Sequence, residues 1–326
     1  MSLEVLGPGL LTTVQDAGRP GWRHAGVGVA GALDGWSLAV ANRLVGNAPD
    51  AAALEITLAG PTLRLRRAAT IALCGATLDA DADGVPRPVT LPAGATLRLG
   101  GCRDGARTLL AVAGGLAVDA VLGSASTDLR GGFGGQQGRA LLRGDVLPLR
   151  DDAPPAVTDR VRIAPWWVDP TPDLDLAREA VLRVLRGSDA TAPADALSAQ
   201  PWRVDAASDR QGLRLEGAAL AIADRRERVS EPVAPGTVQL PPGGAPIVLL
   251  GDAQTHGGYP RIAHVIRADR PRLAQLRPGD AVRFVRCDAA TAHALNDAQR
   301  VRLARMALAI AARRQRDAAS TGWRIG

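Results

Sequence analysis

The stretch PIVLLGDAQTHGGYP, residues 246–260, places an apolar run directly before a polar loop. The run PIVLL has the composition of a buried strand, and the Gly-Asp pair that follows ends it. The loop carries an amide, a hydroxyl, an imidazole and the only tyrosine of the chain, with two glycines that let a ligand approach the backbone closely. These residues are Gln254, Thr255, His256, Tyr259, Gly257 and Gly258. Loops at strand ends carry the chemistry of many folds, so this loop is the first candidate site.

Short apolar runs separated by turn signals continue on both sides of this stretch. In the second half they read VLRVLRG, GLRLEG, GTVQL, RIAHVI and AVRFV, and in the first half they fall at 62–66, 70–73, 96–99 and 108–112. The chain contains 37 glycines and 23 prolines, which suits many turns. Short strands at this spacing predict a mainly β fold of the antiparallel sandwich or barrel type.

Two helices interrupt the predicted strands. The first has Asp34 as its N-cap, apolar residues Trp36, Val40 and Leu44 on one face, and the pair Gly46-Asn47 as its stop. The second covers residues 291–315, and we expect it to pack on the C-terminal domain, with binding to a partner protein as the alternative. Its apolar positions include Val301, Met306 and Ile310.

A proline-rich segment, residues 151–172, predicts a linker between two domains. We therefore expect an N-terminal domain at 1–150, a C-terminal domain at 173–290, and a final helix and tail at 291–326. Several short patterns occur in both halves, but their spacings differ, so they only suggest an internal duplication.

Composition excludes several classes of function. The chain contains no lysine, so it cannot form a Schiff base, a Walker A phosphate site or a biotinyl-lysine. The net charge is +6, but acidic residues are interleaved with the arginines and aromatic residues make up only 3%, which argues against nucleic acid as a partner. No segment has the length of a membrane span and no leader peptide is recognisable, so we expect a cytoplasmic protein with no membrane partner.

Neither the cysteines nor the histidines form a pattern typical of a metal site. The three cysteines are widely spaced, and Cys74 and Cys102 lie in apolar or glycine-rich surroundings, typical of small buried side chains. The four histidines have no cysteine or carboxylate at a metal-ligand spacing. The sequence therefore predicts no metal site and no catalytic triad.

Two glycine-rich stretches invite a nucleotide. Residues 26–31 read GVGVAG and match G-x-G-x-x-G, but the preceding RPGWRH cannot be a central parallel strand, so we reject a dinucleotide fingerprint. Residues 131–138 read GGFGGQQG between two arginines, and we keep two interpretations of them, an anion-binding loop centred on Gly134 and Gly135 or a flexible loop.

Two further polar blocks adjoin strand ends. TTVQDAGRPG, residues 12–21, holds Gln15, Asp16 and Arg19, while SDRQGLRLEG, residues 208–217, holds Asp209 and Arg210. A local Asp-Arg salt bridge is the structural interpretation of each block. Together with the 251–260 loop, the blocks make a shared polar cleft the functional hypothesis.

In this order, the blocks resemble one family. It is the allophanate hydrolase subunit 2 or Kip-antagonist family, also called biotin-dependent carboxyltransferase, which includes the C subunit of 5-oxoprolinase. Besides the blocks above, the resemblance rests on ANRLVGN, LEITLAGP, LAVAGGL, GSASTD, SEPVAPGTVQLP, GDAQTHGGYPRIAHVIRAD and LAQLRPGDAVRF. It extends to about residue 290 and departs from the family pattern at four places. His256 and Ala125 stand where the family has threonine and arginine, the turn GVPxSGAMD is GVGVAGALD, and SDRMG is SDRQG.

The resemblance implies a mainly β fold of two cyclophilin-like β-barrel domains with a few helices. It implies the C subunit of an ATP-dependent 5-oxoprolinase-type amidohydrolase, which cleaves 5-oxoproline to glutamate together with two partners, a Kip-inhibitor-like B subunit and an A subunit. ATP is the implied cofactor, with magnesium left open at the level of the complex. Two alternatives remain. One is carboxyl transfer to a urea-like amide from biotin on another chain, and the other is a non-catalytic protein that binds a kinase-inhibitor-like partner.

For the site we predict a polar cleft that binds a small-molecule amide, with two separate sites as the alternative because the residues come from both domains. The catalytic candidates are Asp16, Asp209, Gln254 and His256, because carboxylates activate water, a glutamine holds an amide and imidazole titrates near neutrality. Arginine suits capture of a carboxylate or phosphate. The candidates for binding substrate or phosphate are Gln15, Arg19, Arg210, Thr255, Gly257, Gly258, Tyr259, Gly134 and Gly135.

Overall fold

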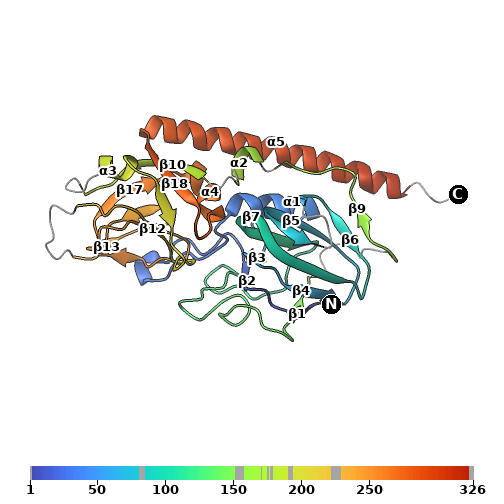
Figure 1. Cartoon of the computed structure of the whole chain (residues 1–326). Coiled ribbons are helices and arrows are strands. Elements are labelled where there is room, and N and C mark those ends of the chain that lie inside the picture. Colours follow the sequence, from blue (N-terminus) through green and yellow to red (C-terminus); the bar gives the residue numbers. More distant parts are fainter. Residues whose placement is uncertain are drawn as a thin grey trace.

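The computed structural model describes residues 2–80, 85–150, 158–169, 171–174, 176, 179–189, 194–221 and 229–322. Two β units lie side by side beneath one long C-terminal helix (Figure 1). Strands dominate and helices are few, so the prediction of a mainly β chain is confirmed. Among the described residues, no helix is long and apolar enough to cross a membrane.

The N-terminal unit is built on a nine-stranded sheet. Its strands are β1 (Ser2–Gly7), β2 (Leu11–Gln15), β3 (Ala53–Thr57), β4 (Thr62–Leu65), β5 (Ala69–Ala80), β6 (Val89–Leu91), β7 (Thr96–Val112), β8 (Val146–Pro148) and β9 (Arg162–Ile163). The first half of the 17-residue β7 pairs with β4, and its second half pairs with β3. The sheet therefore divides into two arms, β4-β1-β8 and β3-β2, that diverge from a common β5-β7 ribbon.

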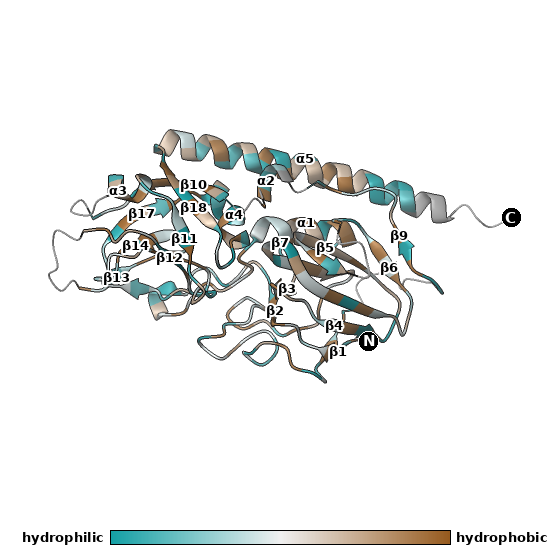
Figure 2. Ribbon diagram, viewed as in Figure 1, coloured by the Kyte–Doolittle hydropathy of each residue, from teal (hydrophilic) through white to brown (hydrophobic). Residues whose placement is uncertain are grey.

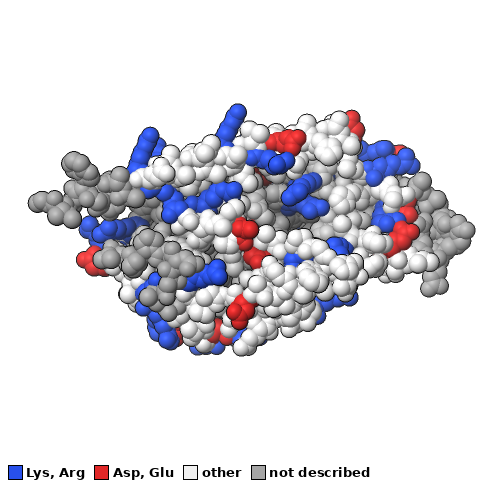
Figure 3. All heavy atoms as spheres, turned by 180° about the vertical axis from the view of Figure 1, so that it is seen from behind, with Lys and Arg blue, Asp and Glu red and all other residues white. Residues whose placement is uncertain are grey.

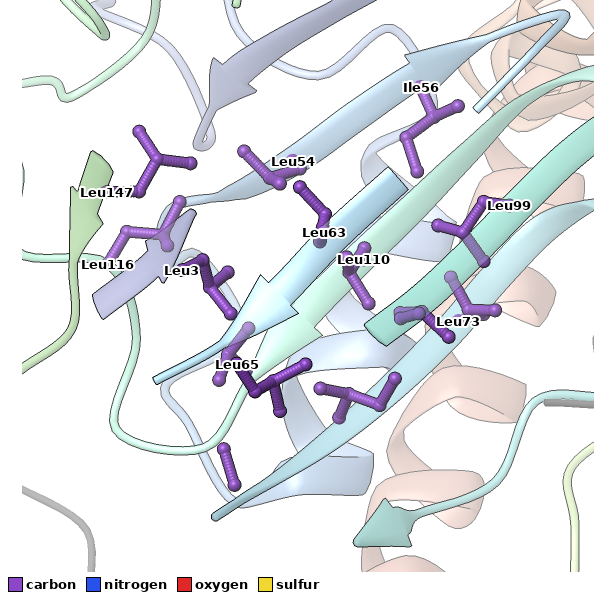
Figure 4. Packing of buried hydrophobic residues seen from close by; sticks show 14 of the residues in the cluster. Leu3, Leu54, Ile56, Leu63, Leu65, Leu73, Leu99, Leu110, Leu116 and Leu147 are labelled. Atoms are coloured by element: carbon purple, nitrogen blue, oxygen red, sulfur yellow. The ribbon is translucent and has the colours of Figure 1, made fainter. Parts of the chain in front are cut away.

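The core of this unit lies between the two arms. Leu54 and Ile56 from β3, Leu63 from β4 and Leu110 from β7 point toward one another there (Figure 4). Each is at most 1% exposed. Alternation along β4 puts Leu63 and Leu65 on this inner face, whereas β5 and β7 also bury apolar side chains on their other face, against α1.

The N-terminal sheet is open, unlike the closed barrel that we expected for this half of the chain. Irregular chain occupies the place of a closing strand. Thr127 and Leu141 donate backbone hydrogen bonds to Val14 and Thr12 on β2, and Val5 on β1 bonds to Asp145. On β2 these bonds satisfy the outer edge without forming a ladder, whereas the bond to Asp145 continues the β1-β8 ladder. The irregular chain also brings the glycine-rich loop against the end of β2.

The C-terminal unit is a closed seven-stranded barrel. Its order is β10 (Glu179–Arg186), β17 (Arg261–Val265), β14 (Thr237–Gln239), β15 (Ile247–Leu249), β12 (Gly212–Glu216), β11 (Trp202–Val204) and β18 (Ala281–Arg286). A parallel pair between β10 and β18 closes it. Its core contains Trp202 and Phe284, each 1% exposed, among aliphatic side chains. A separate two-stranded sheet joins β13 (Glu231–Pro232) to β16 (His256–Gly257).

Helix α1 (Gly35–Val45) matches its predicted start and stop. The Asp34 carboxylate accepts the Ser37 N–H as N-cap, and Gly46 ends the helix in a left-handed conformation. The helix packs on β5 and β7 of the N-terminal sheet. The remaining short helices are η1 (Arg23–Ala25), α2 (Thr171–Leu174), α3 (Ala194–Ser198), η2 (Arg267–Asp269) and α4 (Arg270–Gln275).

The terminal helix α5 (Ala289–Gly322) is longer than predicted and contacts more than the C-terminal unit. It lies against η2 of that unit and also against α1, where Ile310 is 3% exposed. Hydrophilic and hydrophobic residues are mixed along its length (Figure 2). The expectation that it packs on the C-terminal domain is therefore incomplete, because Ile310, the one buried residue of the helix where burial is described, packs in the cluster around α1 of the other unit.

Candidate active site

Asp16 lies just past the end of β2 and holds a turn from a distant part of the chain. Its carboxylate accepts hydrogen bonds from the Ser124 and Ser126 hydroxyls at 2.6 and 2.5 Å. It also accepts the backbone N–H groups of Ala125 at 2.6 Å and Gly18 at 2.7 Å. Both carboxylate oxygens are thus engaged, so the present geometry makes Asp16 the anchor of the 124–126 turn.

Arg19 is buried beside that turn, with a side chain 0% exposed. Its guanidinium donates to the carbonyls of Ser126 and Val121, and lies 4.8 Å from the centre of the Phe133 ring. Its carboxylate neighbour is Asp128 at 4.0 Å, not the local Asp16 that the sequence suggested. The Arg19 Nη1 has no hydrogen-bond partner in the part of the chain that is described.

The glycine-rich loop 131–138 adjoins Arg19, and its first backbone donors are already engaged. The backbone N–H groups of residues 130–133 donate to the carboxylate or the carbonyl of Asp128. A Cβ on Gly134 would clash with the Ser126 carbonyl, and one on Gly135 would clash with the Thr127 hydroxyl. These glycines therefore allow close packing on the 126–127 backbone.

The loop 251–260 forms a second group. The Gln254 Nε2 donates to the Gln239 Oε1 at 3.3 Å, and the Thr255 hydroxyl pairs with the His256 Nδ1 at 3.0 Å. Gln239 is 1% exposed, and its Nε2 has no partner among the described residues. A cavity of about 240 Å³ opens beside this group and is lined by Asp189, Val229, Glu231, Gly257, Gly258, Tyr259 and Arg261.

Arg23 joins the two groups. Its guanidinium donates to the carbonyls of Val233 and Thr255, which belong to the C-terminal unit. Close by, the space beside Gly28 lies between the Ala253 carbonyl and the Asp128 carboxylate, at 3.7 and 3.9 Å from a Cβ placed there. The blocks at 12–21 and 251–260 are thus neighbours across the contact between the units.

Arg210 lies in neither group. It is 3% exposed and forms a bidentate pair with Asp252, at 2.9 and 3.0 Å, together with an ion pair to Glu55 on β3. Burial alone would lower the pKa of Arg210, but Glu55 and Asp252 raise it above its ordinary value. Asp209 is exposed, and its carboxylate accepts the backbone N–H groups of Gln211 and Gly212 in a local turn.

Polar residues that sequence reasoning missed complete the contact between the units. The Gln275 Oε1 accepts the backbone N–H groups of Ala106 and Arg107, and its Nε2 donates to the Asp34 carboxylate at 2.7 Å. Sequence reasoning also passed over Glu55, Asp252 and Gln239, although each lies in a stretch that carries the family resemblance. Their signal was a polar residue within or at the end of an apolar strand run, where burial demands a partner.

Asp34 makes this contact sensitive to pH. Burial raises the pKa of Asp34 to about 6 from an ordinary value of 3.8, although hydrogen bonds from Ser37 and Gln275 oppose the rise. The folded chain therefore holds the proton more tightly than the unfolded chain. The contribution of Asp34 to stability is largest below about pH 4 and is lost as the pH rises through 6.

We therefore predict that the stability gap between the wild type and Asp34→Asn falls by about 2 kcal/mol from pH 4 to pH 7. Urea unfolding across this range measures it. The free energies of unfolding of the two proteins are compared at each pH. Loss of hydrogen bonds in the variant lowers its stability equally at every pH, whereas ionisation of Asp34 makes the difference between the two proteins change with pH. Asp50→Asn, at an exposed position, is the control, and curves that stay parallel for Asp34→Asn would contradict the prediction.

Within the described ranges, no group of three or more His, Cys, Asp or Glu side chains is placed to hold a metal ion. The arrangement instead offers amide and hydroxyl groups at the 251–260 loop, because the guanidinium of Arg210 is already paired with Asp252 and Glu55, and that of Arg19 donates to backbone carbonyls. Such groups hold and orient a polar substrate by hydrogen bonds.

Comparison with known proteins gives concordant matches. The family model described as carboxyltransferase domain, subdomain A and B, matches residues 25–286. The chain is 40% identical over 293 residues to the C subunit of 5-oxoprolinase from Escherichia coli K12, covering 87% of this chain and 91% of that protein. The corresponding C subunit from Haemophilus influenzae is 35% identical over 280 residues, covering 83% and 87%.

Among solved structures, the Kluyveromyces lactis urea carboxylase superposes with a TM-score of 0.83 at 29% identity. The match covers 94% of this chain but only 29% of that chain. The similarity therefore concerns one part of a much longer enzyme.

Proposed function

This chain belongs to the carboxyltransferase-domain family with subdomains A and B, and on that premise we propose that it is the C subunit of an ATP-dependent 5-oxoprolinase complex. The observation that carries the proposal is the 40% identity to the Escherichia coli C subunit over 91% of that protein. The proposed reaction opens the cyclic amide of 5-oxoproline to give glutamate. ATP supplies the activation of the lactam carbonyl.

We propose that substrate contacts come from the 251–260 loop and the buried groups behind it. Gln254 and Gln239 form an amide pair, and the free Nε2 of Gln239 is a donor suited to a carbonyl oxygen. Thr255 and His256 present a hydroxyl and an imidazole next to it. Gly257, Gly258 and Tyr259 line the adjoining cavity.

The N-terminal block takes a positioning role in this proposal. Asp16 fixes the turn that carries Ser126, and the Ser126 carbonyl in turn holds Arg19. Gln15 donates to the Thr127 carbonyl at 3.1 Å and steadies the same turn. We do not extend the proposal to Asp209, Gly134 or Gly135, because an exposed turn and close packing account for them.

As one member of a complex, the chain requires partners, and we propose homologues of the A and B subunits of 5-oxoprolinase in that role. Within it, we propose working units at residues 1–150 and 173–290, with the segment 291–326 appended. We assign ATP to the complex and name no residue of this chain as its contact.

The test is ATP-dependent release of glutamate from 5-oxoproline by the complex reconstituted from all three proteins. We expect turnover with all three present and background release when this chain is omitted. A complete complex that releases no glutamate would overturn the proposal. Binding of a B-subunit homologue without any turnover would favour the non-catalytic role instead.

A second function is favoured by the family model and the urea carboxylase similarity. It is carboxyl transfer to a urea-like amide, with biotin on another chain because this one has no lysine. The same preparation, given a biotinylated carrier, bicarbonate, ATP and urea, distinguishes the two. Consumption of urea but not of 5-oxoproline would establish the second function.

A further inference from the structure

A cavity of about 770 Å³ lies where the two units meet α5. Its walls come from the loop before α1 and the start of that helix, from the end of β15 and the residues after it, from the η2-α4 segment, and from the first half of α5. It shares no lining residue with the smaller cavity at the 251–260 loop. Its volume falls in the range of small-molecule sites.

The lining is rich in positive charge. It contains Arg267, Arg270 and Arg300 against a single carboxylate, the exposed Asp50. Arg300 has a partner in Asp297 at 3.6 Å. Arg267 and Arg270 have no carboxylate within ion-pair distance anywhere in the described chain. Basic side chains predominate over the upper part of one face of the molecule, along α5 (Figure 3).

Arg270 is held in place without a counter-charge. Its guanidinium donates to the Pro235 carbonyl at 2.8 Å, and its buried Nε has no partner in the described chain. Burial lowers the pKa of Arg270, and the neighbouring Arg267 lowers it further. The positive charges of Arg267 and Arg270 repel each other, and the partial burial of Arg270 weakens the screening by water. A bound anion would offset this repulsion and would give Arg270 a hydrogen-bond acceptor.

The rest of the wall suits an organic body more than an inorganic ion. Trp36, Leu38 and Leu303 supply apolar surface from α1 and α5. Trp36 is 5% exposed, and its indole Nε1 has no partner among the described residues. Asn296 and Gln299 add amide groups at the α5 wall.

We propose that this cavity binds a small organic oxyanion, whose carboxylate or phosphate lies between Arg267 and Arg270 and whose apolar part lies against α1 and α5. The site shares no residue with the smaller cavity beside Gly257 and Gly258. Its binding is measured on this chain alone, so its failure and the failure of the proposed function are distinguishable.

The test is calorimetric titration of the full chain at low ionic strength with two probes, glutarate for a carboxylate and adenosine monophosphate for a phosphate. We expect the wild type to bind at least one probe, and the tighter probe identifies the anionic group. The double variant Arg267→Gln, Arg270→Gln is expected to bind about tenfold more weakly or worse, because charge-assisted hydrogen bonds are lost. Arg305→Gln, an exposed arginine of α5 that does not line the cavity, is the matched control and should leave the affinity unchanged.

A second variant keeps both arginines and changes only the space. A Cβ on Gly35, which lines the cavity, meets nothing within 4 Å, so Gly35→Leu extends into open space without a backbone clash. We expect it to fold, since leucine favours a helix more than glycine does, and to weaken the organic probe by about tenfold. No binding of either probe to the wild type overturns the proposal, as does an affinity that Gly35→Leu and the double variant both leave unchanged.

Discussion

Replacing Arg210 with methionine is expected to lower the free energy of unfolding by about 3–5 kcal/mol, a large share of the stability of a typical domain. The reason is that Glu55 and Asp252, at 1% and 6% exposure, lose the cation that balances both of them. Two carboxylates that stay buried without a partner cost far more than the lost hydrogen bonds alone. Because Glu55 lies on β3 and Asp252 follows β15, the loss falls on the contact between the two units.

Urea unfolding measures this loss, and Arg203→Met is the matched control. Arg203 is exposed, with a hydrogen bond to the Gly279 carbonyl at its tip, so its removal should cost well under half as much. A second test removes the negative charges of Glu55 and Asp252 that the loss of Arg210 leaves unpaired. Adding Glu55→Gln and Asp252→Asn to Arg210→Met should recover part of the lost stability. If the triple variant is no more stable than the single one, the explanation from unpaired charge is wrong.

The fold was predictable where local rules decide it. The alternating pattern of TLRLR at 62–66 and GLRLE at 212–216 predicted strands, and both are strands. The cap at Asp34 and the stop at Gly46 gave the bounds of α1, because capping is decided within a few residues.

The closure of the two sheets was not predictable from these patterns. Strand pairing is decided by residues far apart in sequence, and β7 pairs with β4 and β3 through different halves. Nor does an alternating pattern show whether an edge meets another strand or irregular chain, and Val14 is met by irregular chain at Thr127.

The site shows the same division. Sequence reasoning found Asp16, Arg19, Arg210 and Gln254 as polar residues at strand ends, and the structure places each beside the contact between the units. One cleft and two separate sites were both open from the sequence, and in the structure Arg210 lies in a buried ion-pair network while Asp209 stays at the surface. The sequence alone could not show that Arg210 pairs with Glu55 and Asp252, because 155 and 42 residues separate these two carboxylates from it.

Asp16→Asn is expected to lower the turnover of the reconstituted complex by about 100-fold, a loss typical of a displaced catalytic group. In the variant, an NH₂ group replaces one of the two carboxylate oxygens of Asp16. That oxygen accepts either the Ala125 N–H or the hydroxyls of Ser124 and Ser126, and an NH₂ group cannot accept these hydrogen bonds. The 124–126 turn must then shift, and with it the Ser126 carbonyl that holds Arg19. Steady-state kinetics with saturating ATP measure the loss, and Asp119→Asn, at an exposed position, is the control.

The pH profile of that variant separates two roles for Asp16. A positioning residue moves the whole profile down and keeps its shape, because the group that exchanges a proton with substrate is still present. If Asp16 were the general base, its replacement would remove the fall in turnover at low pH, because that fall reports protonation of the base. We expect the unchanged shape, since four donors already occupy the Asp16 carboxylate. Loss of the acidic limb would make Asp16 the base, and turnover equal to that of the control would remove it from the site altogether.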